Sequence, residues 1–422
     1  MRVSDFSRSS DAQRTRVSAL VAWEDSDRPA LRLFFETDSA FAQCFDPGGN
    51  AFLLAAVLTA FRDRERRLWI DGVVCPRLVE GLEAAMELLQ VWYGANRRPV
   101  AIESAGGRRP SVRGPDRSGL FLTNGVDSLH ALWWNRRSYP PGHPAAFRDA
   151  IYVEGLSFPE EVPTPRNLNV TRRERRAVES VAAEYGLTVI PVGTNIRMLA
   201  PEHAFVAKEA LSSLLASVAH GFSRRLTSVT FAAGLNLGRL VPDGSNPMLD
   251  PNYCSSALEI RQEDWTLDRL SKIRRIAGWK TAIENLSVCF EGPLADDRLN
   301  CGRCEKCLRS MVGLLIAGKL SEATAFPPDV TAEALDRLEL INHLEFLPNF
   351  WAPFVEPLKA RGRDDLAVAV RRLVGRARRK ILWLEERDWK GAVRRFDRRH
   401  MGGALLSAWR WQRGLRRPAG PT

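Results

Sequence analysis

The chain has 422 residues, a length that predicts two or three domains. Hydrophobic residues make up 45% of the sequence, which is enough to build folded cores, and no run of 18 or more apolar residues predicts a membrane span. Residues 1–16 are polar and lack the apolar core of a secretion signal. We therefore expect a cytoplasmic protein without a membrane-spanning helix.

The net charge of +11 is concentrated near the C-terminus. Residues 356–422 contain 19 Lys and Arg against 7 Asp and Glu, whereas residues 1–355 contain 42 and 43. We expect a basic helical tail at residues 326–422. Such a tail can be a solvated helical cap, can bind an acidic partner such as RNA or a protein, or can attach residues 405–417 to an anionic membrane surface.

The first 115 residues mix strand-like and helix-like segments. Apolar residues follow the short, alternating pattern of strands in residues 17–23, 31–36, 68–72 and 100–102. Helical spacing appears in residues 50–61 and 76–93. A stretch rich in Gly, Arg, Pro and Ser follows at 105–118 and marks a boundary. These features predict a small α+β domain at residues 1–115.

The most informative stretch of the sequence follows this boundary. Residues 119–122 are apolar and predict a buried strand, residues 123–128 are small or polar, and a helix is expected from there to about Tyr139. A strand, a tight turn and a helix in this order present backbone N–H groups that can bind a phosphate. An ordinary strand–turn–helix, with Asp127 as the residue that caps the helix, is the alternative.

Several side chains of this turn fit a phosphate site. Thr123 and Ser128 offer hydroxyl groups, and Gly125 can adopt a positive φ and allows a ligand to approach the backbone closely. Asp127 can cap the helix or hold a cation. Asn124 tolerates the left-handed conformation better than most residues with a side chain.

Strands and helices continue to alternate after this turn. Strands are expected at residues 149–155, 187–192 and 228–234, and helices at 170–185 and 204–222. This alternation predicts a parallel sheet, which binds ligands at the carboxyl ends of its strands. Gly155 and Gly234 end two of these strands and are candidate cofactor-binding residues, with simple turn geometry as the alternative explanation.

Four of the seven cysteines lie within a span of 19 residues, at positions Cys289, Cys301, Cys304 and Cys307. Pairs of cysteines separated by two residues can bind one ion, and four thiolates suit a tetrahedral structural zinc. An iron–sulfur cluster uses the same four ligands and is the alternative, as are cysteines that are simply buried. The polar residues between the last three cysteines favour a metal site.

The sequence resembles the PP-loop ATP pyrophosphatases, whose phosphate-binding loop reads Ser-Gly-Gly-x-Asp-Ser. Here the loop consists of Thr123, Asn124, Gly125, Val126, Asp127 and Ser128. Residues 287–290 and 300–309, which carry the four cysteines, are similar to the C-terminal zinc knuckle of the 7-cyano-7-deazaguanine synthases, PP-loop enzymes of queuosine biosynthesis. The resemblance covers residues 118–320 and does not include the first domain or the tail.

The resemblance implies an α/β fold with a parallel-sheet PP-loop domain of the adenine nucleotide α-hydrolase type at residues 116–325. It also implies further site residues. Lys272, near the start of a helix, is similar to a lysine that lies near the phosphates in this family, with an ordinary solvated helix lysine as the alternative. Asp250 lies where the family has a substrate motif. Arg197 could reach a substrate from the end of the strand at 187–192, with an ordinary surface arginine as the alternative.

The chemistry that the resemblance implies is ATP-dependent ligation. A substrate carboxylate would attack the α-phosphorus of ATP and release pyrophosphate, and the acyl-adenylate would react with ammonia to give an amide or, after a second activation, a nitrile. Asp127, Ser128 and Lys272 are the expected catalytic residues, with ATP and Mg²⁺ in the site and Zn²⁺ in the knuckle. The alternative is a non-catalytic scaffold that binds a nucleotide and zinc and recruits RNA or a protein through its basic tail.

Overall fold

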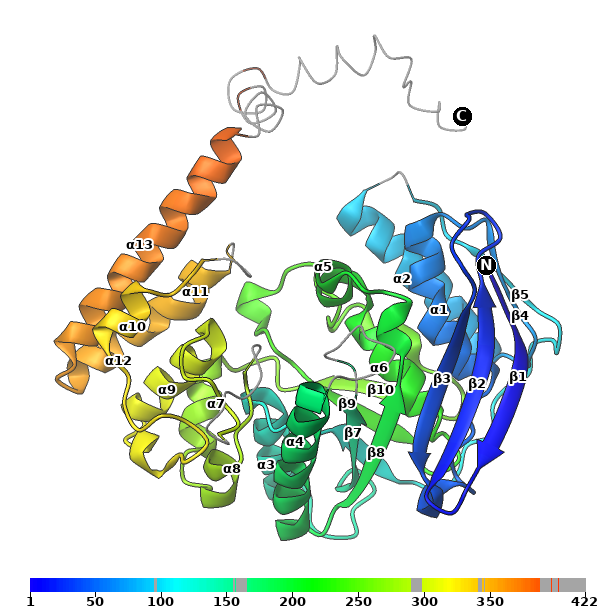
Figure 1. Ribbon diagram of the computed structural model, residues 1–422, viewed down its shortest axis with the longest axis horizontal. Helices are drawn as coiled ribbons and strands as arrows, with labels where there is room; N and C mark the ends of the chain where they lie inside the picture. Colours follow the sequence, from blue (N-terminus) through cyan, green and yellow to red (C-terminus); the bar gives the residue numbers. More distant parts are fainter. Residues whose placement is uncertain are drawn as a thin grey trace. The chain divides into compact units, whose positions relative to one another are not determined.

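A computed structural model describes residues 1–94, 97–154, 156, 165–289, 298–340, 344, 346–387, 396 and 401. The chain divides into two compact units (Figure 1). The first unit contains Met1–Gly302 and Gly313–Pro328, and the second contains Arg303–Val312 and Asp329–Thr422. None of the described helices is long and apolar enough to cross a membrane.

A ten-stranded sheet forms the centre of the first unit, in the order β10-β9-β6-β7-β8-β3-β2-β1-β4-β5. Six of its nine strand pairs are parallel and three, β1–β2, β2–β3 and β3–β8, are antiparallel. The strands are β1 Arg2–Ser10, β2 Arg14–Ala22, β3 Leu31–Asp38, β4 Arg67–Ile70, β5 Ala101–Ser104, β6 Ser118–Phe121, β7 Phe147–Glu154, β8 Thr188–Thr194, β9 Ser228–Ala232 and β10 Glu259–Glu263.

Helices connect these strands. They are α1 Gly49–Asp63, α2 Pro76–Tyr93, α3 Val126–Ser138, α4 Pro165–Glu184, α5 His203–Phe205 and α6 Leu211–His220. Helices α7 Arg269–Ile276, α8 Lys280–Glu284 and α9 Glu305–Ile316 follow β10. A single π-helical turn, Val206–Ala210, joins α5 to α6. The expected helix at residues 204–222 is therefore interrupted rather than continuous.

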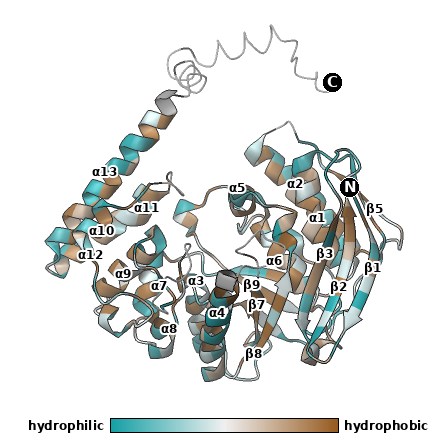
Figure 2. Ribbon diagram, in the orientation of Figure 1, coloured by the Kyte–Doolittle hydropathy of each residue, from teal (hydrophilic) through white to brown (hydrophobic). Residues whose placement is uncertain are grey.

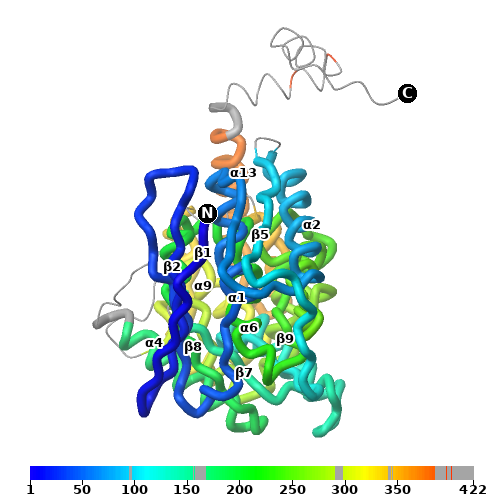
Figure 3. The backbone as a smooth tube through the Cα atoms, turned by 90° about the vertical axis from the view of Figure 1, so that its right-hand side faces the viewer, coloured from blue at the N-terminus to red at the C-terminus, as the bar shows by residue number. Residues whose placement is uncertain are grey.

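The sheet is covered by helices on both faces, as its sequence pattern requires. Alternate strand residues such as Phe121, Ile151 and Phe231 belong to one large core together with buried residues of α1, α2 and α6. Helices α3 and α4 contact the strands of the parallel half; Figure 1 shows both apart from α1 and α2, and Figure 3 shows α4 on the other side from α2. Because both faces are covered, β6 is fully buried and most residues of β7 are buried.

The fold is α/β with a mostly parallel sheet, as expected. The boundary predicted near residue 115 falls between β5 and β6, which are strands of this one sheet, joined through the antiparallel pair β3–β8. The division into an N-terminal domain and a PP-loop domain therefore stays a prediction. Strands β1 and β10 were not expected from the sequence. Strand β1 is polar, and Val3 is its one buried residue.

The second unit is helical. It contains α10 Ala332–Asp336, α11 Leu347–Trp351, α12 Val355–Ala360 and α13 Asp364–Arg387. Helix α13 packs against the other three, and it alternates hydrophobic and hydrophilic residues along its length (Figure 2). The indole of Trp351 is buried and donates a 2.9 Å hydrogen bond to Glu305. The membrane-attachment segment considered above, residues 405–417, lies outside the described residues.

Candidate functional site

The turn between β6 and α3 has one strained residue. Asn124 has a φ of +53°, in the left-handed region, so an asparagine adopts the conformation that glycine usually adopts. Gly125 has φ −71° and ψ 159° and is the residue that caps α3. The expectation that Gly125 adopts a positive φ is therefore wrong, because the chain makes this turn one residue earlier.

The two hydroxyl groups of the turn lie close to each other. Thr123 Oγ1 and Ser128 Oγ are 3.4 Å apart, and Ser128 Oγ donates to the carbonyl oxygen of Gly125 at 3.1 Å. The side chain of Val126 is buried, so this residue can offer a ligand only its backbone. The first N–H groups of a helix have no acceptor within the helix, so those at the start of α3 suit an anion.

The side chain of Asn124 is buried, and its amide nitrogen and oxygen have no hydrogen-bond partner among the described residues. The backbone carbonyl oxygen of Asn124, in contrast, accepts a 2.9 Å hydrogen bond from the N–H of Ser287. A buried amide without a partner is costly, so such groups usually satisfy a ligand, a water molecule or an ion. This makes Asn124 the residue of the turn with the clearest unmet hydrogen-bonding capacity.

Asp127 lies in the first turn of α3 and does not cap the helix. Its carboxylate accepts a 2.9 Å hydrogen bond from Arg269 and lies 3.4 Å from the ammonium group of Lys272, both on α7. The alternative in which Asp127 serves as the N-cap is therefore wrong. Arg269 was not identified from the sequence, although it precedes Lys272 by one helical turn, which places both on one face of α7.

Lys272 is almost fully buried, with 1% of its side chain exposed. Its ammonium group donates to the carbonyl oxygen of Ala233 at 2.6 Å, just after β9, and lies 3.5 Å from Asp264, just after β10. The structure thus brings Lys272 together with Asp127 at the carboxyl ends of the parallel strands, where ligands bind in such sheets. A buried ammonium is stable only with partners of this kind.

Two further residues of this network were missed by the sequence analysis. The imidazole of His130, on α3, forms a very short hydrogen bond with the carboxylate of Asp264, and both side chains are buried. Asp264 has a φ of +76°, and strained residues of this kind cluster at functional sites. The signal available in the sequence was the position of His130, one turn after Asp127 on the same helix.

The two glycines at strand ends have different outcomes. Gly155 lies outside the described residues. Gly234 follows β9, has a negative or extended φ, and a Cβ atom at this position would meet nothing within 4 Å. Neither turn geometry nor packing therefore requires a glycine at residue 234.

Asp250 is fully buried in the segment before β10. Its carboxylate accepts hydrogen bonds from the N–H of Asn246 at 3.1 Å and from the hydroxyl of Ser245 at 3.3 Å. Burial raises the pKa of Asp250 to about 7, which these hydrogen bonds only partly oppose. The carboxylate thus organises its own turn, and its assignment to a substrate stays a prediction.

Arg197 is also buried, in a short helical turn after β8. Its guanidinium donates to the carbonyl oxygens of Ala200 at 2.8 Å and Pro201 at 3.3 Å, and desolvation lowers the pKa of this arginine. These contacts close the connection to α5. These contacts give Arg197 a structural role, and its role in binding a substrate stays a prediction.

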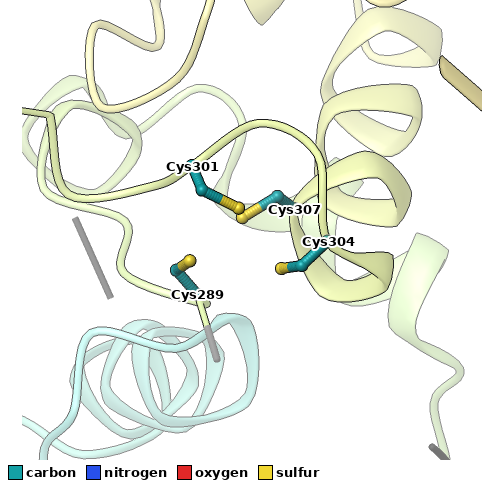
Figure 4. A group of neighbouring side chains, drawn as sticks. All are labelled: Cys289, Cys301, Cys304 and Cys307. Carbon is teal, nitrogen blue, oxygen red and sulfur yellow. The ribbon is translucent and has the colours of Figure 1, made fainter. Parts of the chain in front are cut away.

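The four clustered cysteines come together in space (Figure 4). Their sulfur atoms all lie within 4.8 Å of one another, and Cys301, Cys304 and Cys307 are buried. A tetrahedron with zinc–sulfur bonds of about 2.3 Å has sulfur atoms roughly 3.8 Å apart, so a small contraction would produce it. The cluster can therefore hold a metal ion, and four protein ligands suit a structural ion.

Local structure explains how these cysteines are positioned. Asn300 accepts a 2.9 Å hydrogen bond from the N–H of Val288 and donates to the carbonyl oxygen of Leu286 at 2.6 Å, which ties together the residues that precede Cys301 and Cys289. Gly302 has a φ of +71°, and a Cβ atom there would lie 2.4 Å from Pro327. The position after Cys301 therefore requires glycine.

Searches against models of protein families, curated proteins and solved structures gave no match. The functional assignment of this chain must therefore come from the arrangement of its own residues.

Proposed function

We propose that the chain is an ATP-dependent ligase in which the 123–128 loop binds the phosphates of ATP. The observation that carries the proposal is the convergence of the loop and Lys272. The N–H groups at the start of α3 and the paired hydroxyls of Thr123 and Ser128 lie in the loop, and the carboxylate of Asp127 links this loop to Arg269 and to the buried ammonium of Lys272. This combination suits a polyanion, because backbone dipoles and fixed cations can act on it together.

The reaction that we propose begins with attack of a substrate carboxylate on the α-phosphorus of ATP. The bond between this phosphorus and the bridging oxygen breaks, and pyrophosphate leaves with the electron pair. Ammonia then displaces AMP from the acyl-adenylate to give an amide, with loss of a proton. Donors fixed before the reaction stabilise the charge that grows on the leaving pyrophosphate, which is a large contribution in such enzymes.

The chain's own groups supply much of the positive charge that this reaction needs. Asp127 already accepts from Arg269 and Lys272, so it does not present an open carboxylate to a metal in this arrangement. A Mg²⁺ ion, which neutralises phosphate charge when bound, would then enter the site with ATP. Four thiolates at Cys289, Cys301, Cys304 and Cys307 would hold Zn²⁺ and stabilise the fold, without taking part in the chemistry.

A second candidate is a nucleotide- and zinc-binding scaffold without activity, with a basic tail for an acidic partner. The observation that favours it is the saturation of Lys272, whose three donors face Ala233, Asp127 and Asp264. An ammonium group held in this way must leave one acceptor to bind a phosphate. A lysine that never does so would only stabilise the fold.

One experiment separates the two candidates. The purified zinc-loaded protein is incubated with ATP, Mg²⁺, ammonia and a panel of carboxylic acids, and pyrophosphate release is measured. The ligase proposal expects release that depends on one class of acid and that is lost in Lys272→Ala. Binding of ATP without release in the presence of any acid of the panel would favour the scaffold.

A further inference from the structure

We propose that Ser287 and Asn300 position the nucleotide loop, so that metal binding by the four cysteines and nucleotide binding by the loop are coupled. The inference rests on the proposed function, because it takes residues 123–128 as the nucleotide site. It assigns positioning roles to two residues that belong neither to the four cysteines nor to the 123–128 loop.

The contact between the two sites is a backbone hydrogen bond. The N–H of Ser287 donates to the carbonyl oxygen of Asn124 at 2.9 Å. Asn124 is the strained residue of the loop, with φ +53°, and such conformations persist only when surrounding contacts hold them. The same residue carries the buried amide that has no partner among the described residues. Ser287 therefore holds the loop at the point where its shape is least favourable.

Asn300 fixes the backbone on both sides of Ser287. Its side chain accepts from the N–H of Val288 and donates to the carbonyl oxygen of Leu286, with a second donation to Ala325 at 3.0 Å. Three successive residues are thus held, two by Asn300 and the middle one by Asn124. Since Asn300 is 98% buried, water does not easily replace these bonds.

A third anchor holds the side chain of Ser287. Its hydroxyl lies 3.5 Å from a carboxylate oxygen of Glu174, and the other oxygen of Glu174 accepts a 3.1 Å hydrogen bond from Tyr152 on β7. Burial raises the pKa of Glu174. These contacts leave Ser287 little freedom to move independently of the sheet that carries the loop.

The metal ligands continue directly from these anchored residues. Cys289 follows Val288, and Cys301 follows Asn300. An ion bound by both thiolates would hold the two segments together at the end of the Asn300 hydrogen bonds. Without the ion, the segments can separate, Asn300 loses its acceptors, and Ser287 no longer fixes Asn124. Metal affinity and nucleotide affinity should then change each other by the same factor.

The test uses the full chain loaded with Zn²⁺. Zinc release to a chelator is followed with and without ATP, and ATP affinity is measured before and after zinc removal. Reciprocal coupling of roughly 5- to 150-fold is expected, the usual range for two linked sites. ATP that binds without changing zinc release, or a chain that binds no zinc, would overturn the inference. Because the first measurement starts from the zinc-bound protein, it does not require the metal-free chain to fold.

Two variants separate positioning from general stability. Asn300→Ala should retain measurable ATP binding but reduce the coupling factor toward 1. The matched control is Asn285→Ala, which removes a 2.9 Å hydrogen bond to Thr281 in the adjoining helix and should leave the coupling unchanged. Equal loss of coupling in both variants would indicate general destabilisation and contradict the assigned role.

Amide hydrogen exchange at residues 124–128 distinguishes failure of this inference from failure of the proposed function. Zinc removal should increase exchange of these amides even when ATP is absent. If the chain binds no ATP but this change occurs, the positioning role stands and the proposed function fails. If ATP binds and zinc removal leaves these amides unchanged, the positioning role is wrong.

Discussion

The ammonium group of Lys272 lies 3.4 Å from the carboxylate of Asp127, which is 145 positions earlier in the sequence. This contact connects α7 to the loop that begins α3. It means that the loop and the buried cation form a single charged network, so that a change in one should be measurable in the other.

Replacing Lys272 should therefore destabilise the fold even without a nucleotide. In Lys272→Met the carboxylates of Asp127 and Asp264 lose a shared buried cation, and removal of one partner from a buried pair costs about 3–5 kcal/mol. Lys280→Met is the control, because Lys280 is 81% exposed and an exposed pair contributes less than about 1 kcal/mol. Urea unfolding measures both, and equal effects would show that the buried network contributes little to stability.

Stability should fall as the pH rises, in part because of Asp250. Burial raises the pKa of Asp250 to about 7 from its ordinary value of 3.8, so the folded state binds a proton that the unfolded state has lost between these values. The stabilisation is complete below pH 4 and disappears as the pH passes 7. Asp250→Asn cannot titrate, so it should be close to the wild type at pH 4 and more stable than it at pH 8.

The free energies of unfolding at these two pH values test this prediction. A difference of up to a few kcal/mol between the variant and the wild type is expected at pH 8. Asp116→Asn, which replaces an exposed carboxylate, should show no such dependence. A variant that is equally destabilised at both pH values would show that the charged form of Asp250 is needed in the fold.

Elemental analysis should find one zinc ion per chain. The sulfur atoms of the four cysteines are already within 4.8 Å of one another, and structural zinc contributes directly to folding. Cys301→Ser should lower both the zinc content and the melting temperature. Cys44→Ser, outside the cluster, should leave the zinc content unchanged. Iron with a visible charge-transfer band would instead identify an iron–sulfur cluster.

The C-terminal residues beyond α13 should be dispensable for nucleotide binding. Residues 388–422 hold nine Lys and Arg against two Asp and Glu, whereas residues 1–355 are nearly balanced. A chain that ends at Arg387 should therefore bind ATP as the full chain does. A chain that ends at Pro353 should be less stable, because it loses the buried residues Leu366, Val370 and Leu373 of α13. Weaker ATP binding by the folded chain that ends at Arg387 would contradict the first expectation.

Local patterns predicted much of the parallel sheet from the sequence. Helix α2 has the predicted bounds, and β6, β7, β8 and β9 lie within a few residues of their predicted positions. These segments are strongly apolar or bounded by Pro and Gly, so local patterns suffice. Strand β1 lacks such a pattern, because pairing with β2 and β4 rather than burial of its side chains defines it.

The site was predicted in part, for a similar reason. The four cysteines and the pair Asp127 and Lys272 could be found from spacing and from resemblance. Asp264 could not, because nothing in the sequence shows that it shares a hydrogen bond with His130, 134 positions earlier, although the place of His130 one turn after Asp127 was a signal for the histidine itself. The positive φ lies at Asn124 rather than at Gly125, and the backbone carbonyl of this asparagine accepts a hydrogen bond from Ser287, another distant residue that local patterns do not reveal.

The most direct test of the central claim is the affinity of the full zinc-loaded chain for ATP. Titration of the wild type should show binding, and Ser128→Ala should weaken it roughly 10- to 150-fold, since a hydrogen bond to a charged group contributes about 1.5–3 kcal/mol. Ser138→Ala, at the other end of α3, should bind ATP as the wild type does. A folded chain that binds no ATP, or a Ser128→Ala variant with unchanged affinity, would contradict the assignment of residues 123–128 as the nucleotide site.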